Sequence, residues 1–255
     1  MGRQESTHPQ QTMWLSGHHG QRLRTEAESN FLTITIDNAP VNALDSVAYQ
    51  ELHEIFDQLL TAKTISAVLL RADNRCFCAG QDRRDAPIPP VDSSTYLKHA
   101  ASALALATRC PVPVVAAVKS AAIGAGLILA LTADILVIDE QTILSLPERK
   151  FGVISGYSHL AQWLGRTAIA AVLTGDPIDP QAFANRGGIL LPNDEVDAEA
   201  ERIARSIATD DPSFVVATKS GWSSSRESVA HAYLEEIEQT ISQGSMNFDL
   251  SRSTD

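Results

Sequence analysis

Cysteine is scarce in this chain, and the few cysteines present are poorly placed for cross-linking. There are three, Cys76, Cys78 and Cys110, and they form no C-x-x-C pair. These spacings do not match the disulfide framework of a small secreted protein, and Cys76 and Cys78 alternate along a strand pattern rather than facing one metal ion. We therefore expect reduced thiols, a cytoplasmic protein and no metal site.

Positive charge is also in short supply. The chain has 20 lysine and arginine residues against 31 aspartate and glutamate residues, which gives a formal net charge of −11. Because nucleic acids and anionic membranes attract basic surfaces, this balance argues against both as partners. The 255 residues are 44% hydrophobic, which is enough to bury a substantial core.

No hydrophobic run is long enough to span a bilayer. The most apolar stretch, residues 120–133, has 14 residues between two charged ones and is typical of a buried helix. Residues 1–20 are rich in Gln, His and Ser and lack the apolar segment of a secretory signal. We expect these 20 residues to form a disordered tail.

From about residue 30 onward, strand patterns alternate with helix patterns. Apolar and β-branched runs predict strands at 31–37, 67–71, 114–118 and 135–138. Helical spacing predicts helices from residue 45 or 46 to about 60, from 93 to 109, and from the 124–126 turn to about 132. Beyond residue 160 further helices are expected at 166–174, 180–185, 197–208, 212–221 and 226–243. This order predicts an α/β fold with a helical C-terminal part.

Two segments of small residues interrupt this pattern, Cys-Ala-Gly-Gln-Asp at 78–82 and Ala-Ile-Gly-Ala-Gly at 122–126. Where side chains are small, backbone N–H groups can approach a ligand closely, and two such donors aimed at one point can hold an oxyanion. The second segment could also begin a dinucleotide-binding G-x-G-x-x-G motif. However, Leu129 replaces the third glycine, and no acid lies near residues 144–146 to bind a ribose, which excludes that reading.

Several further motifs occur in order around these two segments. They are Pro-Val-Asn-Ala-Leu at 40–44, Pro-Val-Val-Ala-Ala-Val at 113–118, Thr-Ala-Asp-Ile at 132–135, Leu-Pro-Glu at 146–148 and Leu-Thr-Gly at 173–175. Over residues 30–190 the chain thus resembles the crotonase superfamily, the enoyl-CoA hydratase/isomerase family of fatty acid metabolism. The resemblance implies a spiral of β-β-α units. It also implies a core with an acyl-CoA pocket at 21–195 and a helical oligomerisation region at 196–255, forming homotrimers or hexamers.

The resemblance also implies how an acyl-CoA thioester is held and processed. The backbone N–H groups of Gln81 and Ala125 become the two oxyanion donors, and Glu148 becomes the group that transfers a proton. A carboxyl group in an apolar pocket has a raised pKa, which suits general acid/base work near neutral pH. The alternative for Glu148 is an ion pair with Arg149 or Lys150, which would lower its pKa. CoA arrives as part of the substrate, so no other cofactor is expected.

Other polar residues near these motifs are candidates for supporting roles. Asp82, Arg83 and Arg84 follow the first donor and are assigned to substrate binding, where the arginines meet either CoA phosphates or solvent. Tyr157 and His159 stand where the family usually has proline and glycines, and they either replace a missing acid or base or fill the pocket. A histidine beside an apolar run is more often packed or solvated than catalytic.

One departure from the family pattern bears on the reaction. Where the family often carries a first catalytic glutamate, this chain has Ile128. Hydratases use two carboxylates, whereas a single carboxylate beside a polarised thioester can still move a proton between two carbons. An isomerase-like reaction is therefore favoured over full hydration. The alternatives are an acyl-CoA-binding protein with weak or no turnover and another enolate reaction such as decarboxylation.

Overall fold

A computed structural model of the chain describes residues 20–85 and 93–244. The expected tail at 1–20 lies, apart from Gly20, outside the described residues. The main sheet has six strands in the order β1-β2-β3-β4-β6-β8, and a second sheet pairs β5 with β7. The strands are β1 (Leu23–Glu28), β2 (Phe31–Ile36), β3 (Ala67–Ala72), β4 (Val114–Val118), β5 (Ala121–Ile123), β6 (Ile135–Asp139), β7 (Ile143–Ser145) and β8 (Ile189–Leu191).

Among the strands of the described residues, β1 and β2 pair antiparallel. The other strands run parallel, so long connections must cross from one strand to the next and carry helices with them. Strand β4 reads Val-Val-Ala-Ala-Val and is buried throughout, as expected for a parallel strand covered on both faces. The structure confirms the expected α/β class.

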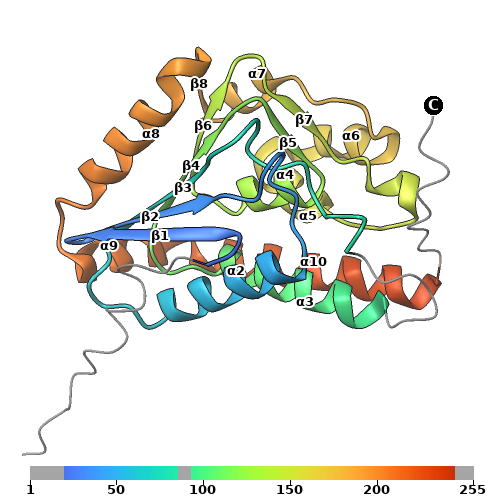
Figure 1. Ribbon diagram of the computed structural model, residues 1–255, viewed down its shortest axis with the longest axis horizontal. Helices are drawn as coiled ribbons and strands as arrows, with labels where there is room; N and C mark the ends of the chain where they lie inside the picture. The colour runs from blue at the N-terminus through green and yellow to red at the C-terminus, as the bar shows by residue number, and fades with distance from the viewer. Residues whose placement is uncertain (1–19, 86–92, 245–255) are drawn as a thin grey trace, which may run out of the picture.

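Helices make up most of the described residues that lie outside the strands (Figure 1). They are α2 (Ser46–Leu59), α3 (Ser93–Thr108), α4 (Ala125–Leu131), α5 (Tyr157–Leu164), α6 (Ala168–Thr174), α7 (Pro180–Ala184), α8 (Asn193–Ile207), α9 (Pro212–Lys219) and α10 (Ser223–Gln243). Short 3-10 turns add η1 (Glu148–Phe151), η2 (Gly165–Thr167) and η3 (Ser220–Trp222). None of the helices in the described part is both long and apolar enough to cross a membrane.

Helix α2 shows how the sequence sets these elements. Asp45 caps it, because its Oδ1 accepts a hydrogen bond from the backbone N–H of Ala48 at 2.9 Å. Leu52, Phe56 and Leu59 recur at helical spacing and are fully buried. This apolar face packs against α3, which in turn packs against α10. These three helices form the lower layer in Figure 1.

Helix α8 covers the opposite face of the sheet, at the upper left in Figure 1. Its Val196, Ala200 and Ala204 are fully buried and belong to a second apolar cluster with Leu69 and Val115 from the central strands. The expected boundary between residues 195 and 196 therefore falls inside a helix that is part of the sheet packing. An oligomerisation role for residues 196–255 stays a prediction.

Buried charges fasten the last helices to the sheet. The Lys219 Nζ lies 2.6 Å from Asp134 Oδ2 and donates to the backbone carbonyl of Val112 at 2.9 Å. Arg226, also buried, donates to the carbonyl of Thr108 at 2.9 Å. Because a buried charge needs a partner, this arrangement fixes where α10 crosses the molecule. Helix α10 is thereby held along α3, where it reaches the cavity described below.

Candidate active site

The two small-residue turns lie side by side. Two isolated parallel bridges pair Cys78 with Ala122 and Leu44 with Gln81. The N–H of Ile123 donates to the carbonyl of Cys78 at 3.0 Å. At Gly80, whose φ is +92°, a Cβ would lie 2.6 Å from the Ile123 carbonyl oxygen and 3.7 Å from the Ala125 nitrogen. Glycine is therefore required at position 80 for this close approach.

The Gln81 N–H points away from the neighbouring strand segment. Leu44 donates to the Gly80 carbonyl and accepts from the Asp82 N–H, both at 2.8 Å. Because these two flanking peptide groups face Leu44, the Gln81 N–H faces the opposite side, where it meets no acceptor among residues 20–85 and 93–244. Gln81 lines a cavity on that side.

Ala125 brings the second free donor to the same cavity. It is the first residue of α4, so its N–H lies outside the helical hydrogen-bond ladder and has no acceptor in the described part of the chain. Gly124 precedes it with a φ of +55° and donates to the Ser145 carbonyl at 2.9 Å, which anchors the turn to β7. Both expected oxyanion donors therefore border one cavity, with a helix N-terminus behind the second.

Glu148 opens η1 immediately after Pro147, and its carboxyl group lies against Gly124. A Cβ at Gly124 would collide with Glu148 Oε1, so the absence of a side chain there makes room for the carboxyl group. Glu148 Oε2 is buried and has no hydrogen-bond partner among the described residues. Burial raises the pKa of Glu148 from 4.5 to about 7.

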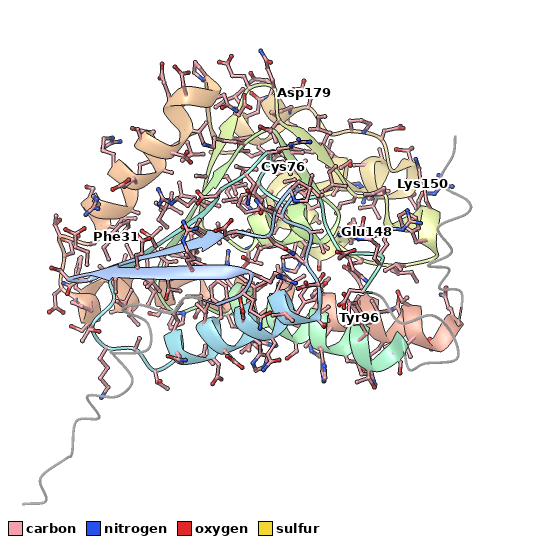
Figure 2. All side chains as sticks on the ribbon, viewed as in Figure 1. Phe31, Cys76, Tyr96, Glu148, Lys150 and Asp179 are labelled. Carbon is pink, nitrogen blue, oxygen red and sulfur yellow. The ribbon has the colours of Figure 1, made fainter. Side chains whose placement is uncertain are left out.

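The expected alternative for Glu148, an ion pair with its neighbours, does not form within the described residues. Arg149 and Lys150 are both exposed, and Arg149 Nη1 donates instead to the Thr174 carbonyl at 3.3 Å. Figure 2 shows Glu148 nearer the middle of the molecule than Lys150. Desolvation therefore sets the pKa of this carboxyl group, and no neighbouring cation among the described residues lowers it.

The cavity itself has a volume of about 210 Å³, more than ten times the roughly 10–15 Å³ that one water molecule needs. Most of its lining is apolar, with few polar side chains. The lining residues are Tyr49, Ala79, Gly80, Gln81, Arg83, Leu97, Ala100, Ile123, Gly124, Ala125, Pro147, Glu148, Phe151, Val153, Ser155, Tyr233 and Ile237. A thioester carbonyl held by two amides, next to one basic carboxylate, is chemically suited to enolate formation.

Comparison with known proteins decides the family. The sequence model for Enoyl-CoA hydratase/isomerase matches residues 26–249, nearly the whole chain. This chain belongs to the enoyl-CoA hydratase/isomerase family. It is 29% identical over 202 residues to a (7aS)-7a-methyl-1,5-dioxo-2,3,5,6,7,7a-hexahydro-1H-indene-carboxyl-CoA hydrolase from Mycobacterium tuberculosis, covering 76% of this chain and 81% of the relative.

Two further comparisons agree on the family and the fold. A probable enoyl-CoA hydratase from Bacillus subtilis is 29% identical over 188 residues, covering 70% of this chain and 73% of that protein. A crystal structure of an enoyl-CoA hydratase/isomerase from Xanthobacter autotrophicus Py2 superposes with a TM-score of 0.79 at 26% identity, covering 89% of each chain. The expected crotonase-like fold is confirmed.

Arg83 is the one other residue expected to bind substrate that lines the cavity in the described part of the chain. Its guanidinium lies 4.6 Å from the centre of the Phe151 ring, which also lines the cavity. Asp82 and Arg84 are not among the lining residues, and they pair with each other at 2.8 Å. Arg84 is exposed, so this pair lies toward solvent.

The two candidate replacement groups, Tyr157 and His159, both lie outside the cavity lining. Tyr157 is exposed at the start of α5. His159 is fully buried; its Nε2 lies 2.8 Å from the Thr108 hydroxyl, and its ring packs edge-on to Tyr233 with centroids 4.9 Å apart. Burial lowers the pKa of His159 to about 3, so the ring stays neutral. Neither is positioned to reach a substrate in this structure.

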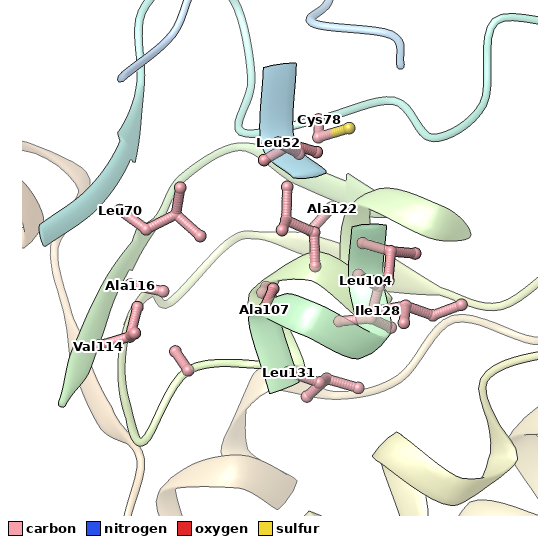
Figure 3. Close-up of a cluster of buried hydrophobic side chains, with 14 of the residues drawn as sticks. Leu52, Leu70, Cys78, Leu104, Ala107, Val114, Ala116, Ala122, Ile128 and Leu131 are labelled. Carbon is pink, nitrogen blue, oxygen red and sulfur yellow. The ribbon is translucent and has the colours of Figure 1, made fainter. Parts of the chain in front are cut away.

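The structure also shows what takes the place of the family's first glutamate. Ile128 is 1% exposed and packs within the apolar core beside Leu104 and Leu131 (Figure 3). It does not line the cavity, and Glu148 is the one carboxylate that does so among the described residues. The described residues also contain no cluster of three or more His, Cys, Asp or Glu side chains that could hold a metal ion.

Sequence reasoning missed three polar residues of the cavity, Tyr49, Ser155 and Tyr233. Tyr49 lies on α2 and Tyr233 on α10, elements with no motif of their own. Burial raises the pKa of both phenols, so both stay protonated at neutral pH. The only sequence signal was the departure from the family pattern at 155–159, which pointed to that segment but not to Ser155.

Proposed function

We propose that this protein acts on an acyl-CoA thioester and stabilises the thioester enolate between the N–H groups of Gln81 and Ala125. Glu148 is the single acid/base. The observation that carries this proposal is the position of the Glu148 carboxyl group, which lies against Gly124 with Oε2 buried, in the same cavity as both free amides. Desolvation there raises the pKa of Glu148 to about 7. At neutral pH such a group exists in both protonation states and can take up and return a proton.

The reaction best supported is the movement of a double bond. The Glu148 carboxylate removes a proton from C2 of a 3-enoyl thioester, and the electron pair of that C–H bond forms an enolate whose oxygen the two amides hold. The same carboxyl group then returns the proton to C4, and the double bond moves from C3–C4 to C2–C3. The overall change is an isomerisation that needs one carboxylate and no other cofactor.

Hydration is less well supported because it requires a second group to hold and activate water. The position that often supplies this group in the family is occupied by Ile128, whose side chain is in the core. The relatives named above include a hydrolase and a probable hydratase, so the family as such does not favour one reaction. Decarboxylation and acyl-CoA binding with weak or no turnover are the alternatives compatible with the same amide pair.

Purified protein incubated with 2-enoyl-CoA and 3-enoyl-CoA thioesters, followed by the absorbance of the conjugated thioester, tests this proposal. We expect the 3-enoyl substrate to gain the conjugated absorbance and the 2-enoyl substrate to hydrate slowly or not at all. Rapid hydration would overturn the preference for isomerisation. Tight binding of both thioesters without turnover would favour the binding protein, and full activity in Glu148→Ala would overturn the role of Glu148.

The assembly that we propose is a homotrimer, or a hexamer formed from two trimers. Its support is the family resemblance together with the exposed apolar residues of the C-terminal helices, such as Phe214 and Trp222. Equilibrium sedimentation of the full chain measures the assembly directly.

A further inference from the structure

The carboxamide of Gln81 is among the polar side chains of the cavity that take no part in the proposed mechanism. The mechanism uses the backbone N–H of this residue only. The side-chain Nε2 is buried and has no hydrogen-bond partner among the described residues. A buried donor without an acceptor destabilises the protein, and an acceptor supplied by a ligand would remove that penalty.

Tyr233 provides a second donor in the lining of the same cavity. It is 3% exposed and is carried by α10, which the Lys219 and Arg226 anchors hold in place. Its phenol oxygen interacts with the side chain of Ser155, another cavity residue. With burial keeping it protonated, the Tyr233 hydroxyl is a donor rather than a base.

Much of the remaining cavity lining is apolar. Leu97 and Ala100 from α3, Val153 after η1, and Ile237 from α10 line the cavity and offer no hydrogen bonds through their side chains. A purely hydrocarbon acyl chain would fit these walls but would leave the Gln81 amide unpaired. A ligand oxygen that accepts from the buried donors would therefore be favoured strongly over a hydrocarbon group at the same position, because the hydrocarbon would leave the donors unpaired.

We propose that the acyl group of the substrate carries a second carbonyl oxygen beyond the thioester, for which the Gln81 carboxamide and the Tyr233 hydroxyl are the hydrogen-bond donors. The substrate class is therefore oxoacyl-CoA thioesters rather than simple hydrocarbon acyl-CoA thioesters. This inference rests on the proposed function, because it assumes that the thioester lies at the two backbone amides. It adds specificity-determining roles for two side chains.

The test compares the binding of saturated thioesters of equal chain length, which have no double bond to move. Hexanoyl-CoA, 3-oxohexanoyl-CoA and 5-oxohexanoyl-CoA are titrated calorimetrically into the wild-type protein and into Gln81→Met, Tyr233→Phe and Ser155→Ala. We expect at least one oxo thioester to bind about tenfold or more tightly than hexanoyl-CoA, and this ratio to fall toward one in Gln81→Met and Tyr233→Phe. Ser155→Ala should reduce the ratio less.

Tyr96→Phe is the matched control, because it removes the hydroxyl of a tyrosine that does not line the cavity. It should leave the ratio unchanged. Affinity for hexanoyl-CoA reports on folding in every variant, since a misfolded protein loses both ligands and only the ratio is compared. Equal binding of all three thioesters by the wild-type protein would overturn this inference alone. Failure to bind any of them would overturn the proposed function as well.

Discussion

Replacing Glu148 by Gln should make the protein more stable at high pH, because the wild-type chain must ionise a buried carboxyl group there. The pKa of this group is raised from 4.5 to about 7 by burial, and no cation among the described residues pairs with it. Below pH 4.5 the carboxyl group is neutral in both the folded and the unfolded chain, so its titration has no effect on stability. Above pH 7 it is ionised in both, and the folded chain bears the full desolvation penalty.

The size of this effect follows from the two pKa values. Between pH 4.5 and 7 the folded chain binds more protons at Glu148 than the unfolded chain does, so the free energy of unfolding falls as the pH rises. One pKa unit corresponds to about 1.4 kcal/mol, which makes the complete penalty roughly 3 kcal/mol. Part of it is already present at pH 5, so roughly 2–3 kcal/mol should develop between pH 5 and pH 8.

Urea unfolding of the wild type and of Glu148→Gln at a series of pH values measures this directly. A constant offset from the new amide is expected at every pH, so the quantity that matters is how the difference between the two proteins changes with pH. The neutral, exposed substitution Gln141→Ala is the control and should give a difference that is independent of pH. A difference for Glu148→Gln that stays constant from pH 5 to pH 8 would refute the argument from desolvation.

Three further predictions concern activity and the core. First, kcat/KM for a 3-enoyl thioester should rise about tenfold per pH unit up to about pH 7 and then level off, because Glu148 loses its proton over this range. A profile that falls through pH 7 would contradict the role of Glu148 as the base. Second, Gly124→Ala should lower kcat about 100-fold by displacing the Glu148 carboxyl group, whereas Gly165→Ala, at a similar φ but with open space around it, should leave kcat unchanged. Third, Ile128→Glu should lower the free energy of unfolding, measured with urea, by about 3 kcal/mol or more and should not hydrate 2-enoyl-CoA. Ile128→Leu should lower the free energy of unfolding much less.

The buried parallel strands could be predicted because their side chains identify them without help from the rest of the fold. The patterns at 67–71 and 114–118 are continuous apolar runs, and the structure has β3 and β4 there within one residue. Helix α2 was predictable for a similar reason, since its cap and its apolar spacing agree. In each case one local signal was strong enough to decide the structure.

The elements that the sequence did not reveal are short or depend on distant partners. Strands β5 and β7 have three residues each, too few for a period to show, and they exist because they pair with each other beside the 122–126 turn. Helix α5 begins at Tyr157, in a segment that departs from the family pattern and for which the sequence predicted no helix. The cavity residue Tyr233 is separated from the motifs by most of the C-terminal region, and the packing of α10 against α3 and α5 brings it to the cavity that Glu148 lines.

The burial of Ile128 connects the stability of this protein with its chemistry. Suppose that the side chain at position 128 lined the cavity. Isoleucine in place of the family's glutamate would then leave a gap beside Glu148 that water could fill, and the carboxyl group would be better solvated. In this structure Ile128 instead packs into the core, and apolar residues such as Leu97 and Ile237 line the cavity. That environment makes Glu148 a stronger base and at the same time makes its ionised form destabilising. The isomerase-like chemistry that we propose and the stability penalty at high pH would therefore have one cause, and a measurement of either constrains the other.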